Sequence, residues 1–277
     1  MTEVRRPSAP GPVVAVLGLG EAGSLIAADL LAAGAVVRGF DPAVRASDVD
    51  ARIADCDGDA DACRGAAVVL SLTCAHEAEN ALADALRGIT SPAIYADLNT
   101  ASSGLKVRLA ERAEAAGIAF ADVAVMSPVP VGGLRTPMLA CGPAAARYAR
   151  ILGDLGGSVE VLAGPPGTAA ARKLVRSVYY KGLAAAVIEA LRAAKAAGCE
   201  EWLRQNIRQE LASASTETVD RLEAGSLRHA RRRAEEMTAA ADLLAELGVA
   251  PRIAEASAHW LRQLAAEQGA ATDADPA

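Results

Sequence analysis

The sequence predicts an α/β domain followed by an all-helical domain, and three observations carry this prediction. Short β-branched runs alternate with Ala- and Leu-rich segments in the first part of the chain, which is typical of βαβ units and a mostly parallel sheet. From Thr168 to about Glu267 no strand-like run follows, and GPPG at 164–167 separates the two parts. The expected organisation is an α/β domain over 12–165, a helical domain over 166–268, and flexible termini at 1–11 and 269–277.

Local sequence justifies each element in turn. VVAVL at 13–17 predicts a buried strand, and the helix after it is expected to end at Gly34, since glycine commonly follows a helix. Further strands are expected at 35–40, 66–73, 93–98 and 118–125, with short ones at 137–142 and 159–164. Helices are expected at 21–34, at 102–117 and, as a long interdomain helix, from Thr168 to about Ala197. Breaks in the helical region are expected at Gly198, Gly225 and Gly248.

Composition excludes several classes of protein. The net charge of −6 would repel a polyanion, so nucleic acid is not expected as a partner. The N-terminal segment has no apolar stretch long enough for a signal peptide, and VVAVLGLG is too short to span a membrane. The five cysteines form no CxxC pair, and the three histidines have no metal-ligand spacing. We therefore expect a cytoplasmic protein without a membrane segment, disulfide framework or metal site.

A glycine-rich motif follows the first expected strand. GLGEAG at 18–23 matches GxGxxG, opens the next expected helix, and is followed by Asp41 at the end of the second strand. Gly18 permits a tight turn, Gly20 lets the backbone approach a pyrophosphate, and Gly23 lets helix and strand pack closely. The helix N-terminus offers free N–H groups to phosphates. The alternative is an α/β turn with incidental glycines, but strand, helix and acidic residue together favour a Rossmann-like dinucleotide-binding domain.

The acidic residue at position 41 bears on the choice of cofactor. A carboxylate can accept hydrogen bonds from a ribose diol and repels a 2′-phosphate, so Asp41 favours NAD over NADP. Arg45 lies close in sequence and offers a partner for a 2′-phosphate, which keeps NADP as the alternative.

Polar residues at the ends of two more strands extend the expected cofactor site. Thr73 and Cys74 end the third strand, and Asn99 and Thr100 end the fourth, where the carboxyl edge of a Rossmann sheet binds its ligand. Cys74 is interpreted as a wall residue rather than a nucleophile. For Asn99 and Thr100 the alternative is capping of the helix near Ser102. The predicted cofactor-binding residues are Gly18, Leu19, Gly20, Glu21, Ala22, Gly23, Asp41, Thr73, Cys74, Asn99 and Thr100.

The long interdomain helix carries a stripe of polar residues. Lys173, Ser177, Tyr180 and Lys181 have the spacing i, i+4, i+7 and i+8 and share one face. Lys173 could protonate a nascent alkoxide in carbonyl reduction or remove the hydroxyl proton in oxidation, if desolvation and a nicotinamide cation depress its pKa. The alternative is a solvated helix face.

The motifs together resemble the β-hydroxyacid dehydrogenase and 6-phosphogluconate dehydrogenase superfamily. The resemblance runs in order through VAVLGLGEAG, VVLSLTCAHEAENAL, YADLNTASS, ADVAVMSP, TPMLACGP and GPPGTAAARKLVRS. KLVRSVYYKGLAAAVIEAL and HARRRAEEM resemble a subgroup with a phosphogluconate-dehydrogenase-like C-terminal domain of unknown function. In the family motif GxxGxGxxxKxxNN, Lys173 falls on the catalytic lysine, which the resemblance implies is a general acid/base.

Two departures from the family bear on the substrate. The family loop DAPVSGG corresponds to a stretch from Asp122 to Pro128 in which Ser127 is the candidate carboxylate donor, and the Gly-Gly pair is missing or displaced to 132–133. The family asparagine after the lysine is Ser177 here. We expect Lys173 and Ser177 to be catalytic and Ser127, Lys181 and Tyr180 to bind substrate.

The expected reaction is hydride transfer between nicotinamide and a small β-hydroxy acid or its oxo acid. One alternative is an imine reductase of the same architecture, against which the retention of Lys173 argues. The other is a non-catalytic NAD-binding sensor. The many small residues of the helical domain favour a homo-oligomer, with a dimer preferred. His229, Arg232, Arg233 and Glu236 form a helix-spaced cluster that suits either an acidic ligand or a salt-bridge network.

Overall fold

The chain forms two compact units that divide within one long helix. The computed structural model describes residues 11–90 and 92–273. The first unit extends to Arg176 and the second begins at Ser177, both inside α8 (Thr168–Ala196). The predicted domain boundary at 165 precedes this helix. The expectation of flexible ends at 1–10 and 274–277 falls outside the described residues, and α12 continues to Asp273, past the expected limit of 268.

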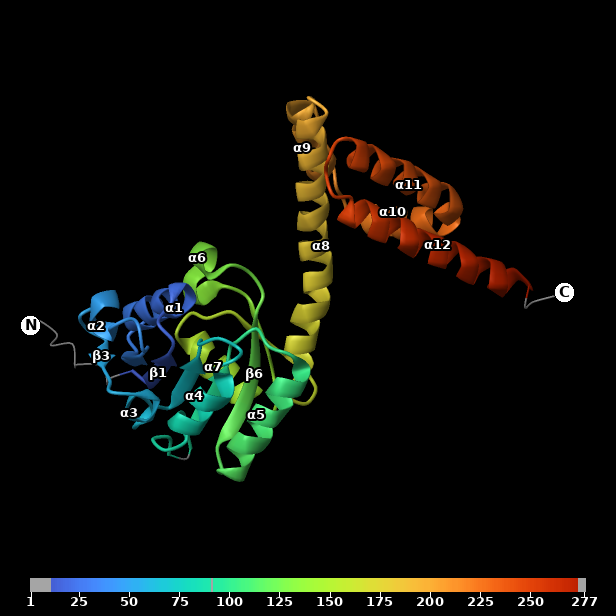
Figure 1. The fold of residues 1–277 in the computed structure, drawn as a ribbon. Helices are drawn as coiled ribbons and strands as arrows, with labels where there is room; N and C mark the ends of the chain where they lie inside the picture. The colour runs from blue at the N-terminus through green and yellow to red at the C-terminus, as the bar shows by residue number, and fades with distance from the viewer. Residues whose placement is uncertain (1–10, 91, 274–277) are drawn as a thin grey trace, which may run out of the picture. The chain divides into compact units, whose positions relative to one another are not determined.

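The first unit is built on one eight-stranded sheet (Figure 1). Its strands lie in the order β3-β2-β1-β4-β5-β6-β7-β8, and all neighbours are parallel except β6 and β7. The chain leaves β1 for β2 on one side and returns to β4 on the other, so the sheet has a switch point between β1 and β4. The strands are β1 (Val13–Leu17), β2 (Val36–Phe40), β3 (Ala54–Asp55), β4 (Val68–Ser71), β5 (Ile94–Asp97), β6 (Ala119–Val125), β7 (Met138–Cys141) and β8 (Val159–Val161).

Helices cover both faces of this sheet (Figure 1). One core packs α1, α6 and α7 against the alternate strand residues Val14 and Val16, and the other packs α3, α4 and α5 against Ala15 and Leu17. This alternation explains why β1 is apolar throughout, since a parallel strand covered on both faces has no polar side. The helices are α1 (Glu21–Ala32), α2 (Ala46–Val49), α3 (Asp59–Cys63), α4 (Ala78–Ala85), α5 (Ser103–Ala115), α6 (Val129–Gly132), the 3-10 helix η1 (Gly133–Arg135) and α7 (Ala145–Asp154).

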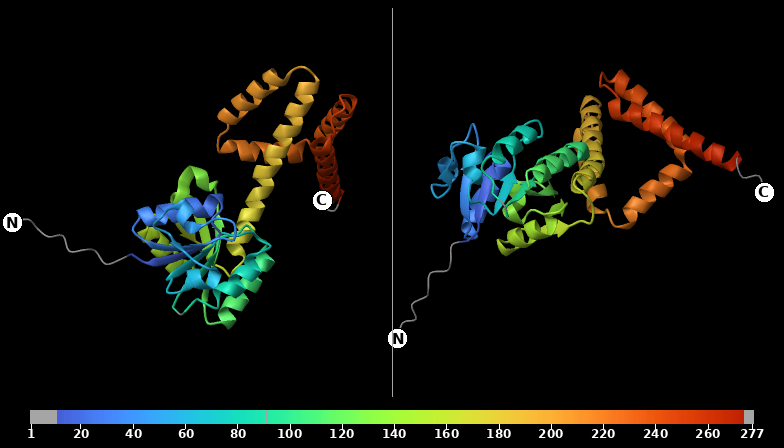
Figure 2. Two further views of the ribbon diagram at one scale, coloured as in Figure 1. Left: turned by 60° about the vertical axis from the view of Figure 1, so that its left-hand side comes forward. Right: turned by 90° about the horizontal axis from the view of Figure 1, so that it is seen from below.

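The second unit contains only helices in its described residues (Figure 2). They are the C-terminal part of α8, then α9 (Glu200–Ala212), α10 (Glu217–Arg228), α11 (Ala230–Glu246) and α12 (Arg252–Asp273). The α11 and α12 helices form an antiparallel pair. The Glu189 carboxylate accepts the backbone N–H groups of Ile253 and Ala254 at 2.8–3.0 Å and so caps the start of α12. In the described part of the chain, no helix is both long and apolar enough to cross a bilayer.

The predicted α/β and helical parts are confirmed, and two of three predicted helix breaks are correct. Gly198 and Gly248 follow α8 and α11 with φ of +76° and +72°, the left-handed conformation that suits a helix end. The break predicted at Gly225 is wrong, because this residue lies inside α10. A Cβ there would lie 3.0 Å from the Arg233 guanidinium, so the glycine makes room for a neighbouring side chain instead.

Candidate functional site

The glycine-rich turn joins β1 to α1 at the switch point of the sheet. Gly18 has φ of +89°, and a Cβ there would lie 2.5 Å from the backbone oxygen of Leu72. A Cβ on Gly23 would lie 1.9 Å from the Gly18 oxygen. Gly20 is different, because nothing lies within 4 Å of a Cβ built on it. Gly18 and Gly23 are therefore required by packing, while Gly20 leaves open space at the N-terminus of α1, where a pyrophosphate binds in Rossmann domains.

Asp41 holds the same turn from the end of β2. Its Oδ2 accepts the Leu19 N–H at 2.8 Å, and its Oδ1 accepts the N–H groups of Ala43 and Val44 at 2.8 and 3.1 Å. Each carboxylate oxygen offers about two lone-pair sites, so these bonds leave acceptor capacity for a ribose hydroxyl. Asp41 is therefore a structural anchor of the turn as well as a candidate ligand.

A cavity of about 390 Å³ lies beside this turn. It brings together the predicted residues Gly18, Gly20, Asp41, Thr73 and Cys74. Its other lining residues are Phe40, Pro42, Asp59, Leu72, Glu77, Asn80, Ala81 and Asp84. The carboxyl ends of β1, β2 and β4 thus enclose the space in which a Rossmann domain holds its nucleotide.

Several predicted cofactor residues do not line this cavity. Leu19 is buried and contributes its N–H to Asp41, and Gly23 serves helix packing. Glu21 and Ala22 begin α1, and Thr100 is exposed one residue beyond Asn99. The contact of Glu21, Ala22, Asn99 and Thr100 with a cofactor stays a prediction.

Carboxylates that the sequence analysis missed line the cavity. Asp59, Glu77 and Asp84 join Asp41 there, and none of the described lining residues is a lysine or arginine. Burial and the neighbouring Asp84 and Asp41 charges raise the pKa of Asp59 to about 6. No motif marks these residues, because Asp59 lies on α3 while Glu77 and Asp84 lie at the start and near the end of α4, and only the fold brings the two helices together. Arg45, the expected alternative partner for a phosphate, contacts Asp55 at 3.4 Å instead.

Cys74 lies on the exposed rim of the cavity. Its Sγ is 3.3 Å from Nε2 of His76, which is also exposed. Cys74 is part of the cavity wall, and its contact with a cofactor stays a prediction.

Asn99 is buried at the end of β5 and does not cap the next helix. Ser102 is the N-cap of α5, with its Oγ accepting the Leu105 N–H at 3.2 Å, so the capping alternative for Asn99 is wrong. The Asn99 Nδ2 instead donates to Asp97 Oδ1 at 2.6 Å and lies 3.2 Å from both Ser71 Oγ and Thr73 Oγ1. Through Thr73 this cluster reaches the cavity wall.

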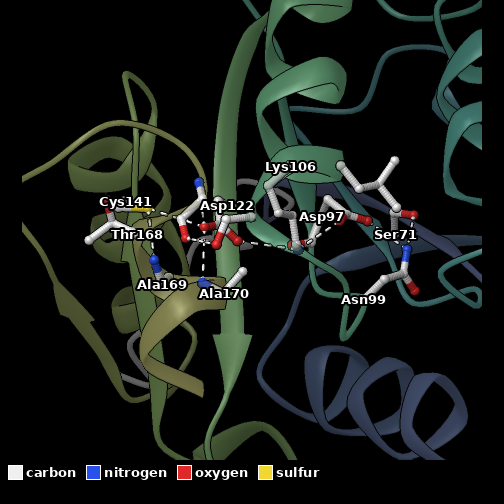
Figure 3. Close-up of polar contacts among 12 residues, drawn as sticks. Ser71, Asp97, Asn99, Lys106, Asp122, Cys141, Thr168, Ala169 and Ala170 are labelled. Atoms are coloured by element: carbon white, nitrogen blue, oxygen red, sulfur yellow. Dashed lines mark hydrogen bonds and ion pairs between the residues drawn. The ribbon is translucent and has the colours of Figure 1, made fainter. Parts of the chain in front are cut away.

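A fully buried ion triad, which the sequence analysis did not predict, continues this cluster (Figure 3). The Lys106 Nζ lies 2.7 Å from Asp97 Oδ2 and 3.2 Å from Asp122 Oδ1, and all three side chains are inaccessible to solvent. It also donates to the Asp97 backbone oxygen at 2.7 Å. The available signal was the position of Lys106, which shares the core-facing side of α5 with Leu109 and Ala113.

The second carboxylate of the triad holds the start of α8 (Figure 3). The Asp122 Oδ2 accepts the N–H groups of Gly167 and Ala170 at 2.9 and 3.2 Å. A carboxylate is favourable at this position, because helix N-termini carry unpaired N–H groups and a partial positive charge. Lys173, half-buried, follows within the next turn.

One turn further along α8, the helix reaches the loop after β6. The Arg176 guanidinium donates to the backbone oxygen of Met126 at 2.7 Å. Met126 follows the carboxyl end of β6, and parallel strands share that edge, so this part of α8 lies at the same edge as Gly20 and Thr73. Ser127 is exposed beside Met126. The displaced glycine pair packs elsewhere, since a Cβ on Gly133 would lie 2.0 Å from Asp29 Oδ2.

The remaining predicted substrate residues lie on the part of α8 that belongs to the second unit. Lys181 Nζ lies 3.4 Å from Ser177 Oγ, one turn away, and Tyr180 packs edge-on against Tyr179. Their roles toward a substrate stay predictions.

The basic cluster after α10 forms a network of its own. Arg232 forms an ion pair with Glu236, and Arg233 donates to Ser226 Oγ at 2.7 Å. These contacts favour the salt-bridge interpretation of the cluster. Among the described residues no set of three or more His, Cys, Asp or Glu side chains could hold a metal ion.

Comparison with known proteins places the two units in recognised families. Residues 13–159 match the NAD-binding domain of 6-phosphogluconate dehydrogenase, and residues 194–264 match a domain of unknown function, DUF1932. None of the curated proteins has a significant sequence match to this chain.

Solved structures resemble nearly the whole chain. A conserved hypothetical protein from Sinorhizobium meliloti 1021 is 29% identical, over 92% of this chain and 88% of that one, with a TM-score of 0.59. MTH1747, a conserved protein of unknown function described as structurally similar to 3-hydroxyacid dehydrogenases, is 29% identical over 91% and 97%, with a TM-score of 0.58. An imine reductase from Myxococcus stipitatus in complex with NADP⁺ has a TM-score of 0.78 over 92% and 95%, but at 18% identity it shows the fold alone.

Proposed function

Since the chain belongs to the family defined by the NAD-binding domain of 6-phosphogluconate dehydrogenase, we propose that it is an NAD-preferring dehydrogenase of small β-hydroxy acids. The observation that carries the proposal is the cavity at the carboxyl edge of the sheet, where Gly20 leaves the start of α1 open and Asp41 flanks the space. That combination suits a pyrophosphate and a ribose diol. Bound nicotinamide supplies the hydride chemistry.

The charge of the cavity favours NAD over NADP. Asp41, Asp59, Glu77 and Asp84 line it, while Arg45 is paired with Asp55. A 2′-phosphate would add close to two negative charges beside these carboxylates, whereas a ribose hydroxyl can donate to one of them.

Lys173 is proposed as the general acid/base. In oxidation its neutral amine accepts the substrate hydroxyl proton, and in reduction its ammonium returns a proton to the carbonyl oxygen. The Asp122 cap on α8 and the Arg176 contact with Met126 hold this part of the helix on either side of Lys173. Catalysis by proton transfer needs such a fixed position, because the donor must lie within hydrogen-bond reach of the reacting oxygen.

Four polar side chains are proposed to complete the site. Ser177 replaces the family asparagine as a hydrogen-bond partner beside the lysine. Ser127, Tyr180 and Lys181 are donors suited to the substrate carboxylate. Hydroxyl groups and an ammonium are donors that bind a carboxylate, which is the reason for proposing these residues.

Imine reduction is the second candidate, and the imine reductase likeness over more than nine-tenths of both chains favours keeping it. The nitrogen of an imine is basic enough to take a proton from solvent before hydride adds to the neighbouring carbon, whereas an alkoxide formed from a carbonyl needs a positioned proton donor, so a lysine acid/base is not essential to imine reduction. Lys173 therefore argues for the alcohol substrate.

A substrate and cofactor matrix tests the proposal. Purified protein is assayed with a panel of small β-hydroxy acids and NAD⁺ or NADP⁺, and with cyclic imines and NADH or NADPH. Turnover of a hydroxy acid with NAD⁺ is the expected result. Reduction of imines alone would replace the proposal with the second candidate. NADH binding without any turnover would favour an NAD-binding sensor.

We further propose that the protein is a homodimer formed through its helical unit. Homodimer interfaces are more apolar than the rest of a protein surface. The helical unit exposes the large apolar side chains Val178, Ile188, Trp202, Leu211, Val219, Leu222, Leu243 and Trp260, which a partner subunit could bury. Light scattering of the purified chain measures its mass in solution. A monomeric mass at micromolar concentration would contradict the assignment.

A further inference from the structure

The Asn99 side chain is buried with only one of its two polar ends satisfied. It is 5% exposed, and its Nδ2 contacts Thr73 Oγ1 at 3.2 Å and faces Asp97 and Ser71. Figure 3 shows the side chain beside Ser71 and Asp97. Its Oδ1 is buried and has no hydrogen-bond partner among the described residues. A buried acceptor without a donor is unfavourable, so its persistence points to a donor supplied by a ligand.

The direction of this amide is set by Asp97. An ionised carboxylate only accepts hydrogen bonds, so Asp97 Oδ1 at 2.6 Å requires the Asn99 nitrogen on that side and leaves the oxygen on the other. The second oxygen of Asp97 contacts the Lys106 ammonium at 2.7 Å. Lys106 balances the charge of this buried carboxylate, because a buried charge needs a partner of opposite sign.

Lys106 also connects the Asn99 amide to the start of α8. Its ammonium lies between Asp97 and Asp122, and each carboxylate uses one oxygen for Lys106 and the other for a segment of the site. Asp97 thereby orients Asn99, and Asp122 holds Gly167 and Ala170 at the start of α8. The buried Lys106 ammonium therefore helps to fix the positions of both Asn99 and the start of α8.

We propose that Asp97, paired with Lys106, is a positioning residue that makes Asn99 present a hydrogen-bond acceptor to the dinucleotide. The proposal rests on the proposed function, in which the cavity beside Thr73 holds NAD. The donors that such a ligand brings are ribose hydroxyls and a carboxamide N–H group. Thr73 lines the cavity and accepts a hydrogen bond from Asn99 Nδ2 at 3.2 Å, so Asn99 lies one residue behind the cavity wall.

The variant Asp97→Asn should reverse the direction of the Asn99 amide while keeping the size of the side chain at position 97. The Lys106 ammonium still needs an acceptor, so the new side-chain oxygen faces Lys106 and the new NH₂ group faces Asn99. Asn99 must then turn over and present its own NH₂ group as a donor. Asp154→Asn is the matched control, because it removes an exposed carboxylate at the end of α7.

A double-mutant cycle on NADH affinity tests whether Asp97 acts through Asn99. We expect Asp97→Asn and Asn99→Ala each to weaken NADH binding by about tenfold or more. The two changes together should weaken NADH binding no further than Asn99→Ala alone, because the Asn99 amide through which Asp97 acts is then absent. Additive losses in the double variant, with melting temperatures matched across the set, would overturn the proposal.

A spectroscopic readout keeps the test independent of turnover. The wild-type chain contains three asparagines, Asn80, Asn99 and Asn206, so ¹⁵N labelling of asparagine gives three side-chain amide signals, and Asn99→Ala assigns one. Asp97→Asn adds a fourth signal, and the double variant shows which of the four belongs to Asn99. In the ligand-free protein the Asn99 NH₂ protons should exchange slowly with water, and at least about tenfold faster in Asp97→Asn. Equal protection in both proteins would refute the positioning role. A protein that lacks turnover but shows this contrast would retain the positioning role and lose only the proposed reaction.

Discussion

The Asp41 carboxylate accepts the backbone N–H of Leu19 at 2.8 Å and thereby ties the end of β2 to the glycine-rich turn after β1. One oxygen holds the turn, and the other holds the backbone at Ala43 and Val44. The residue expected to select the cofactor thus also shapes the space in which the cofactor would bind.

Asp41→Ala should weaken NADH binding by about tenfold to a hundredfold, because the turn loses its anchor and the ribose loses an acceptor. NADPH binding should fall less, since the same change removes a negative charge that repels the 2′-phosphate. Titration of both reduced cofactors by fluorescence measures the ratio. Asp48→Ala, an exposed carboxylate on α2, is the control. An unchanged ratio of affinities would contradict the role of Asp41 in selection.

Gly20→Ala and Gly23→Ala should separate ligand binding from folding. A Cβ at Gly20 meets no protein atom within 4 Å, so this variant should fold normally and lose NADH affinity by about tenfold or more. A Cβ at Gly23 would lie 1.9 Å from the Gly18 oxygen, so this variant should lose about 2 kcal/mol or more of stability. Thermal melts and NADH titrations give the two quantities. Full NADH affinity in Gly20→Ala would show that the pyrophosphate lies elsewhere.

Asp59→Asn should stabilise the protein above pH 6 and have little effect near pH 4. Burial and the Asp84 and Asp41 charges raise the pKa of Asp59 to about 6, from an ordinary value of 3.8. The native state therefore holds a proton between these values that the unfolded state has lost, and stability falls as pH rises from about 4 to 6. Removing the charge should restore about 1–2 kcal/mol at pH 8, after allowance for solvent screening. Urea denaturation at several pH values measures this gain, and an equal gain at pH 4 would contradict the assignment.

Lys106→Met should cost about 3–5 kcal/mol of unfolding free energy, because it leaves two buried carboxylates without their cation. Arg108→Met is the control on the same helix. It breaks an exposed contact with Glu79 at 3.0 Å and should cost about 1 kcal/mol or less. Chemical denaturation compares the two variants. A similar small loss in both would mean that Lys106 is not confined between the carboxylates.

Much of the fold could be predicted because it follows from local periodicity. The apolar run at 13–17 and the glycines at 18–23 mark a strand, turn and helix that need no distant contact to be recognised. Gly225 shows the opposite case. Its helix continues through the glycine, and the Arg233 guanidinium of α11 lies where a Cβ would need space. Helix propensity takes no account of such a contact between helices.

The candidate site was predicted where a motif exists and missed where only the fold assembles it. Gly20, Asp41 and Thr73 lie together as the motif and the strand ends predicted. Lys106 was missed because a charged residue in an amphipathic helix is expected at the surface, and its two partners come from separate strands. The three residues are separated in the sequence, so the triad can be recognised only from their burial and their ion-pair distances in the structure.

Turnover of a β-hydroxy acid with NAD⁺ by Lys173→Ala, measured beside the wild type, tests the central claim most directly. Lys195→Ala, an exposed lysine near the end of the same helix, is the matched control. We expect Lys173→Ala to lose about 10²- to 10⁴-fold in kcat while NADH binding is unchanged, and Lys195→Ala to retain full activity. Full activity of Lys173→Ala would contradict its role as general acid/base and, with it, the proposed dehydrogenase mechanism.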